Sequence, residues 1–276
     1  MPGADLPAGS TLQDPASLAE QALTYYASEP GRSALIRITA DGITWEGGAS
    51  PDAVRPAASL LKLAVALAAE EAIADGSLDL SRRVAIADLS VAPDDRSVLD
   101  LLDSARQVSV GEILALMLGA SDNPCARWLV EALGLARITQ CVTHLQCIAT
   151  TVEADESAGV RGTTTCRDAL TLLAAASDQV RYPLSAGALR HSIRNSRIPL
   201  GATDDDIRIT HKTGTLLGLA HDVAVLECAE GRAEIAFLTE EQHDTLITGY
   251  AMGLCTRTVL EAWGLSVRST TSVAGA

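Results

Sequence analysis

Apolar and polar positions along this chain predict a helix and then a β-hairpin in its first fifty residues. Apolar residues recur on one helical face over about residues 16–28. Two runs with strand-type side chains follow at 34–39 and 43–45, and the Asp41-Gly42 pair between them is typical of a tight hairpin turn. We therefore expect one helix followed by two antiparallel strands.

The middle of the chain predicts a block of helices. The run from Ser59 to about Asp75 is apolar on nearly every side, so it should form a buried central helix that ends at Gly76. Ser109 and Glu112 make a capping box, which marks the start of the next helix. Further helices are expected over about residues 124–132, 136–145, 165–177 and 183–194.

The last third of the chain predicts strands and one long helix. Short β-branched runs indicate strands over 208–212, 222–228 and 233–238, and an amphipathic segment indicates a helix over about 241–263. Both ends of the chain can then contribute to one sheet. The predicted fold class is α/β, of the α+β type, with a five-stranded antiparallel sheet flanked by helices and an inserted all-helical block. A cleft for a ligand is expected between the sheet and this block.

We expect a single catalytic domain over residues 1–276, divided into two regions. The sheet region would comprise about residues 16–55 and 196–265, and the helical region about 56–195. Residues 1–15 and 269–276 are expected to be loose tails, since the first of them is rich in Pro, Gly and Asp.

The composition restricts which binding partners and which cellular compartment we expect for this protein. The formal net charge of −14 argues against nucleic acid or an anionic membrane surface as a partner. The first 30 residues lack the basic and apolar segments of a secretory signal, and the six cysteines form no CxxC pair. We therefore expect a cytoplasmic protein with reduced core thiols, unless a leader upstream of Met1 has been removed. No His/Cys spacing indicates a metal site, so neither a metal nor another cofactor is expected.

Lysine is rare in this chain: among 21 basic residues only Lys62 and Lys212 are lysines. A guanidinium stays charged at any ordinary pH, whereas an ammonium can lose its proton when it is buried or lies near other cations. Lys62 closes Ser59-Leu60-Leu61-Lys62, and residues three apart share a helix face, so its amine should lie beside the Ser59 hydroxyl. Burial and the second lysine would favour a neutral Lys62 that can take the serine proton, while Lys212 is expected to stay charged.

Three motifs occur in order along the chain: SxxK at residues 59–62, Ser121-Asp122-Asn123, and Lys212-Thr213-Gly214. With them the chain resembles class A serine β-lactamases and penicillin-binding proteins, over roughly residues 16–265. The resemblance implies a β-lactamase-like fold and a serine hydrolase that works through an acyl-enzyme.

The resemblance also implies a role for each residue of the first two motifs. Ser59 would be the nucleophile and Lys62 its base. Ser121 would pass a proton to the leaving group. Asn123 would hold the substrate amide and help to orient Lys62, and Asp122 would be structural.

The Lys-Thr-Gly strand would bind the substrate. Lys212 would attract a carboxylate and Thr213 would hydrogen-bond it, while Gly214 would let the substrate approach the backbone. The backbone N–H groups of Ser59 and Thr215 would form an oxyanion hole. The implied partner is a small molecule that carries an acyl group and a carboxylate.

Two positions depart from the family pattern. Class A β-lactamases carry a deacylating glutamate, usually as Glu-x-x-Leu-Asn, and Glu156 is the nearest candidate although no Leu-Asn follows it. A solvated acidic loop is the alternative for Glu156. Where family lactamases often place a carboxylate-binding arginine, this chain has His221, which would either bind substrate or pack.

The resemblance implies β-lactam hydrolysis as the family activity, and two other functions stay open. The chain could be a cytosolic esterase, amidase or acyltransferase that serves a biosynthetic pathway. It could also be a binding or sensor protein of the same fold that captures a ligand without turnover. The loop around Glu156 is the feature that separates the three.

Overall fold

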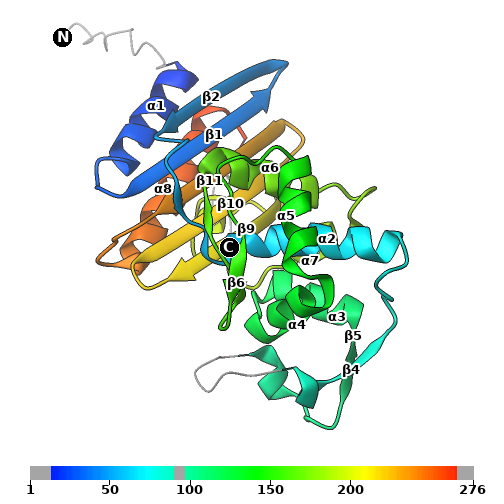
Figure 1. Ribbon diagram of the computed structural model, residues 1–276. Coiled ribbons are helices and arrows are strands. Elements are labelled where there is room, and N and C mark those ends of the chain that lie inside the picture. Colours follow the sequence, from blue (N-terminus) through cyan, green and yellow to red (C-terminus); the bar gives the residue numbers. More distant parts are fainter. Residues whose placement is uncertain (1–13, 90–96, 266–276) are drawn as a thin grey trace, which may run out of the picture.

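The computed structural model describes residues 14–89 and 97–265 of the chain. Five strands form one antiparallel sheet in the order β2-β1-β11-β10-β9 (Figure 1). The expectation of a five-stranded sheet built from both ends of the chain is confirmed. Most of the expected tails, at 1–13 and 269–276, lies outside the described residues. The strands are β1 (Arg32–Ala40), β2 (Ile43–Ala49), β9 (Arg208–Leu216), β10 (Leu219–Glu227) and β11 (Gly231–Thr239).

The turn between β1 and β2 follows directly from its two residues. Asp41 and Gly42 have φ values of 51° and 76°, and a two-residue turn with both residues left-handed matches the twist of the flanking strands. Ala40 then pairs with Ile43. Glycine and aspartate tolerate this backbone better than most residues, so the dipeptide sets the register of the hairpin.

Helices cover both faces of the sheet (Figure 1). α1 (Pro15–Tyr26) and α8 (Thr245–Ala262) pack together on one face, and α6 (Cys166–Ala176) lies on the other face with the helical block. Neighbouring residues of β10 alternate between the two cores, with Val223 on the side of the helical block and Ala224 on the side of α1 and α8. The sheet is therefore buried on both faces, which explains why β10 is apolar at almost every position.

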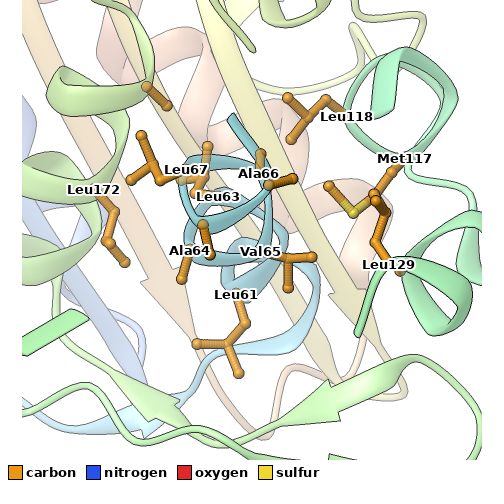
Figure 2. Packing of buried hydrophobic residues seen from close by; sticks show 14 of the residues in the cluster. Leu61, Leu63, Ala64, Val65, Ala66, Leu67, Met117, Leu118, Leu129 and Leu172 are labelled. Carbon is orange, nitrogen blue, oxygen red and sulfur yellow. The ribbon is translucent and has the colours of Figure 1, made fainter. Parts of the chain in front are cut away.

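Helix α2 (Lys62–Ala74) forms the centre of the helical block. Ten of its 13 residues are buried, which accounts for the apolar pattern on all its sides. Met117, Leu129 and Leu172, from three other helices, lie around it (Figure 2). The other helices of the block are α3 (Val110–Gly119), α4 (Asn123–Leu133), α5 (Leu135–His144) and α7 (Pro183–Arg190).

Several element boundaries differ from the sequence predictions, such as the end of α7 at Arg190 and not near 194, and tertiary contacts explain two of the differences. β9 continues beyond Lys212 to Leu216, since it pairs with β10 along its whole length. α8 begins at Thr245 rather than near 241, because the Asp244 carboxylate accepts hydrogen bonds from two backbone N–H groups of its first turn.

The remaining strands form short antiparallel pairs. Each pair is too short to give a periodic sequence signal. β3 (Arg55–Pro56) pairs with β8 (Thr163–Thr164), β4 (Arg83–Ala85) with β5 (Gln107–Ser109), and β6 (Glu153–Asp155) with β7 (Gly159–Arg161). Within residues 14–89 and 97–265, no helix has the length and apolar character of a membrane span.

Candidate active site

The three motifs meet where the helical block contacts strand β9. Lys62 is the first residue of α2, Ser121 lies between α3 and α4, and Lys212 lies on β9. The Nζ atom of Lys62 donates hydrogen bonds to the Ser121 carbonyl oxygen at 2.5 Å and to Asn123 Oδ1 at 2.7 Å. Its distance to Ser121 Oγ is 3.5 Å. The fold thus brings the lysine of the first motif onto the turn that carries the second.

Lys212 reaches the same hydroxyl from the opposite element. Its Nζ atom donates to Ser121 Oγ at 2.9 Å and to the Thr213 carbonyl oxygen at 2.8 Å. Both lysines are 1% exposed, whereas Ser121 is partly exposed. The Ser121 hydroxyl therefore lies between two buried amines and can exchange a proton with either of them.

The protonation of Lys212 differs from the sequence expectation. Burial and the positive charge of Lys62 hold the pKa of Lys212 well below its usual range, and Arg194 and Arg197 lower it further. The carboxylate of Asp222 opposes this effect only in part. Burial and these neighbouring cations therefore oppose the charged form that the sequence analysis expects for Lys212, whereas Asp222 favours it.

Both motif serines lie at constrained backbone positions. Ser59 belongs to a 3₁₀ turn, η1 (Ala58–Leu61), and not to the α-helix that the sequence predicts there. Ala58, directly before it, has a φ of 49°, and Ser121 itself has a φ of 62°. Non-glycine residues adopt this left-handed region rarely and at a cost, so the surrounding structure must hold both turns in place.

Gly214 allows strand β9 to lie close to the turn that carries Ser59. A Cβ atom at Gly214 would be 3.2 Å from Ala58 Cβ and 3.1 Å from His221 Cδ2, which is tighter than ordinary packing. Thr215 follows on the same strand and is exposed. The backbones of Ser59 and Thr215 consequently belong to contacting elements, as a shared oxyanion hole requires.

Asp122 has the structural position that the resemblance implies. Its carboxylate accepts hydrogen bonds from Cys125 N at 3.1 Å, at the start of α4, and from Ser97 Oγ at 2.6 Å. It is 3% exposed. Asp122 therefore fixes the turn between α3 and α4 on which Ser121 and Asn123 depend.

Among the described residues, no hydrogen bond or ion pair joins Glu156 to a motif residue. Glu156 is exposed, in the turn between β6 and β7. The other face of this hairpin packs on α4, where a Cβ atom at Gly159 would be 3.0 Å from Arg127 Cα. The hairpin's other acids are already used: the Asp155 carboxylate accepts hydrogen bonds within the turn, and Glu153 pairs with Arg161. The alternative of a solvated acidic loop is the one that the structure favours.

His221 packs in the interior and is not available to a substrate. Its Nε2 atom lies 2.7 Å from the Pro56 carbonyl oxygen, and its Nδ1 atom accepts a hydrogen bond from Thr239 N at 3.0 Å. The side chain is fully buried, and this burial lowers the pKa of His221 to about 4. A neutral ring that donates from Nε2 satisfies both contacts.

Arg197 is the residue that sequence reasoning missed. It follows α7, and its buried guanidinium donates to the Gly214 carbonyl oxygen at 2.9 Å, to Thr215 Oγ1 at 2.6 Å and to the His221 carbonyl oxygen. A cation thus lies behind the exposed end of the Lys-Thr-Gly strand. The sequence analysis considered His221 for the carboxylate-binding role that a cation has there in family lactamases. No motif or periodicity marks Arg197, because its position depends on how the segment after α7 returns to the sheet.

The fold and the three motifs together define a protein of the β-lactamase type. A family model that describes the β-lactamase enzyme family matches residues 26–263, and the chain belongs to this family.

Individual proteins show how far this similarity extends. The β-lactamase regulatory protein BlaB of Streptomyces cacaoi is 26% identical over 257 residues, a match that covers 71% of this chain and 81% of BlaB. The β-lactamase of Sphaerobacter thermophilus is 22% identical, with a TM-score of 0.79 over 91% of this chain and 99% of its own. PBP-A is also 22% identical, with a TM-score of 0.75 over 91% of this chain and 97% of its own. A mutant of PBP-A has been solved as an acyl-enzyme complex with penicillin G. At these identities the solved structures share the fold with this chain.

Proposed function

We propose that this protein forms an acyl-enzyme at Ser59 with a small amide, lactam or ester that carries a carboxylate. The observation that supports this best is the Ser121 hydroxyl, which is 2.9 Å from Lys212 Nζ and 3.5 Å from Lys62 Nζ. A hydroxyl in that position can relay a proton between a base and a leaving group. A site built only for binding has no need of two buried amines around one hydroxyl.

The proposed reaction uses each proton once. Ser59 Oγ adds to the carbonyl carbon of the donor while the Lys62 amine accepts the hydroxyl proton. The bond to the leaving nitrogen or oxygen then breaks. Ser121 donates its proton to that atom and takes the proton held by Lys62, which returns Lys62 to its starting state. The backbone N–H groups of Ser59 and Thr215 would stabilise the oxyanion.

Substrate binding would fall to the end of strand β9. Lys212 and Thr213 are proposed to hold the substrate carboxylate, with Arg197 adding positive charge behind Thr215. Asn123 would hold the donor amide. The carboxylate also offers Lys212 a counter-ion that the free protein lacks, so substrate binding would favour the charged form of this lysine.

Release of the acyl group is proposed to be slow. Glu156 is exposed in the turn of the β6–β7 hairpin, and among the described residues no hydrogen bond or ion pair holds its carboxylate toward the motif residues, which supports this proposal. Without a positioned general base, attack by water on the acyl-enzyme loses about 10²–10⁴ in rate. Benzylpenicillin should therefore label Ser59 and remain attached far longer than in an enzyme with such a base.

Intact-mass measurement over time tests this proposal. One equivalent of benzylpenicillin mass should appear on the wild type and not on Ser59→Ala, and it should persist after excess penicillin is removed. Rapid loss of the adduct would show an efficient β-lactamase and contradict slow release. No adduct with penicillin or with a reactive ester would contradict acyl-enzyme formation itself.

A ligand-capturing regulator is the second candidate, because the relative BlaB is described as a β-lactamase regulatory protein. An esterase, amidase or acyltransferase would instead hand the acyl group to an acceptor other than water. Adding small amines to the isolated adduct separates the two. Accelerated release with formation of the amide indicates transfer, whereas an adduct that resists all acceptors indicates a sensor.

A further inference from the structure

Arg194 lies directly beside the turn that carries Ser121. The segment after α7 passes the end of α3, where Ile193 N donates to the Gly119 carbonyl oxygen at 3.0 Å. Arg194 Nε then donates to the carbonyl oxygen of Ala120, the residue before Ser121, at 3.3 Å. This contact places the guanidinium on the turn that carries the Ser121 hydroxyl, which is proposed to protonate the leaving group.

Arg194 forms no ion pair within the part of the chain that the structure describes. Among the described residues no carboxylate lies within ion-pair distance of it, although the chain carries a net charge of −14 and many of its other arginines pair with acids. Arg194 is exposed, and in residues 14–89 and 97–265 the one hydrogen bond of its side chain is from Nε–H, so the two terminal nitrogens can face a ligand.

The basic side chains around the motifs are more numerous than one substrate carboxylate requires. Lys62, Lys212, Arg194 and Arg197 gather around the motifs, and Asp222 is the acid that acts on Lys212. The Asp222 carboxylate is fully buried and already contacts His211 Nδ1 at 3.0 Å and Ile198 N at 3.0 Å. Lys212 and Arg197 suffice for one carboxylate at the end of β9. Arg194, which contacts the Ala120 carbonyl oxygen, is then not needed to hold that group.

We propose that Arg194 forms a second anion subsite, which selects acyl donors whose leaving-group half carries an additional acidic group. This inference rests on the proposed acyl-enzyme function. Because Ser121 protonates the leaving atom, the half of the donor beside Ser121 is the leaving group, and Arg194 can reach an acid on it. A planar guanidinium with two free N–H-bearing nitrogens suits a carboxylate in particular.

Two aryl esters of phenylacetylglycine test the subsite because they differ only in the leaving group. One releases 3-hydroxybenzoate, with a single carboxylate, and the other releases 5-hydroxyisophthalate, with two. The second-order rate constant for Ser59 acylation is measured with each ester at low and at physiological salt. The wild type should prefer the dicarboxylate by about five- to tenfold at low salt, and less at physiological salt.

Three variants test whether Arg194 causes the preference for the dicarboxylate leaving group. Arg194→Gln should reduce it to below about twofold, whereas Arg194→Lys, which keeps a charge, should retain part of it. Arg208→Gln is the matched control, because it removes an exposed charge at the far end of β9 and should leave the preference intact.

The inference is overturned if the wild type shows no preference, or if Arg194→Gln keeps it. An equal loss in Arg194→Lys and Arg194→Gln would show that Arg194 acts through its bond to Ala120, and would overturn anion binding as well. Acylation by both esters at one rate defeats only the second subsite. If neither ester nor penicillin labels Ser59, the proposed function fails, and this inference fails with it.

Discussion

Replacing Lys62 with arginine is expected to reduce the rate of Ser59 acylation by about 10³-fold or more. Arginine keeps the positive charge but has no accessible neutral form, so it cannot accept the serine proton. Lys62 is 1% exposed and is held by Ser121 O and Asn123 Oδ1, so its amine is confined beside the Ser121 turn. The rate is measured by intact mass or by stopped-flow with a chromogenic β-lactam.

Controls must separate the loss of a base from a distorted site, because a larger guanidinium has to fit the same buried space. Lys62→Met fills a similar volume without a base and should be equally inactive while its Tm stays near that of the wild type. In Lys62→Ala, added methylamine should restore part of the acylation rate, which a purely structural role would not allow. Normal acylation by Lys62→Arg or Lys62→Met would disprove the role of Lys62 as base.

Acid should destabilise the protein by about 2–3 kcal/mol between pH 6.5 and 4.5, because of His221. The pKa of His221 is about 4 in the folded chain, against 6.5 for an ordinary histidine. Below pH 6.5 the unfolded chain therefore binds a proton that the folded chain does not. The stability that depends on the neutral ring is present above pH 6.5 and is lost as the pH falls toward 4.

The carboxylates lose their stabilising contacts in a separate, more acidic range. The hydrogen bonds and ion pair of Asp75 hold its pKa at about 2, and those of Asp155 lower its pKa as well. Such groups destabilise the fold only when the pH falls below the usual carboxyl pKa. The range from pH 6.5 to 4.5 therefore reports mainly on His221.

Urea unfolding at several pH values measures this effect. His221→Gln, whose amide can both donate and accept, should show a flatter dependence than the wild type across this range. His243→Gln, at an exposed position, should retain the wild-type slope. The same slope in His221→Gln and in the wild type would rule out His221 as the source.

Local sequence determined the elements of the fold well, because each has a signal within its own length. Asp41-Gly42 selected the hairpin, and Ser109 with Glu112 selected the start of α3, where both side-chain contacts of the capping box form. The apolar run after Ser59 indicated a buried helix because burial on all sides removes the usual periodicity. The boundaries of β9 and α8 were missed, since pairing and capping set them.

The two lysines and the motif serines could also be identified from the sequence, because spacing and residue type carry their chemistry. What the tertiary structure alone decided is how these groups meet. The Ser121 hydroxyl lies between lysines that are 59 and 91 residues away along the chain. Arg194 and Arg197 also contact the motif segments, and they come from a part of the chain that no sequence pattern marks. Glu156 is instead exposed in a hairpin turn, and His221 is buried in the core.

The physical reason is that proton affinity and access depend on surroundings, not on residue type. Burial, together with three nearby cations, lowers the pKa of Lys212. Burial lowers the pKa of His221 as well, whereas Glu156 remains exposed at a hairpin tip. The sequence by itself determined which groups could take part in acylation. Only the tertiary structure decided their neighbours, the direction in which burial shifts their pKa values, and the exposure of Glu156.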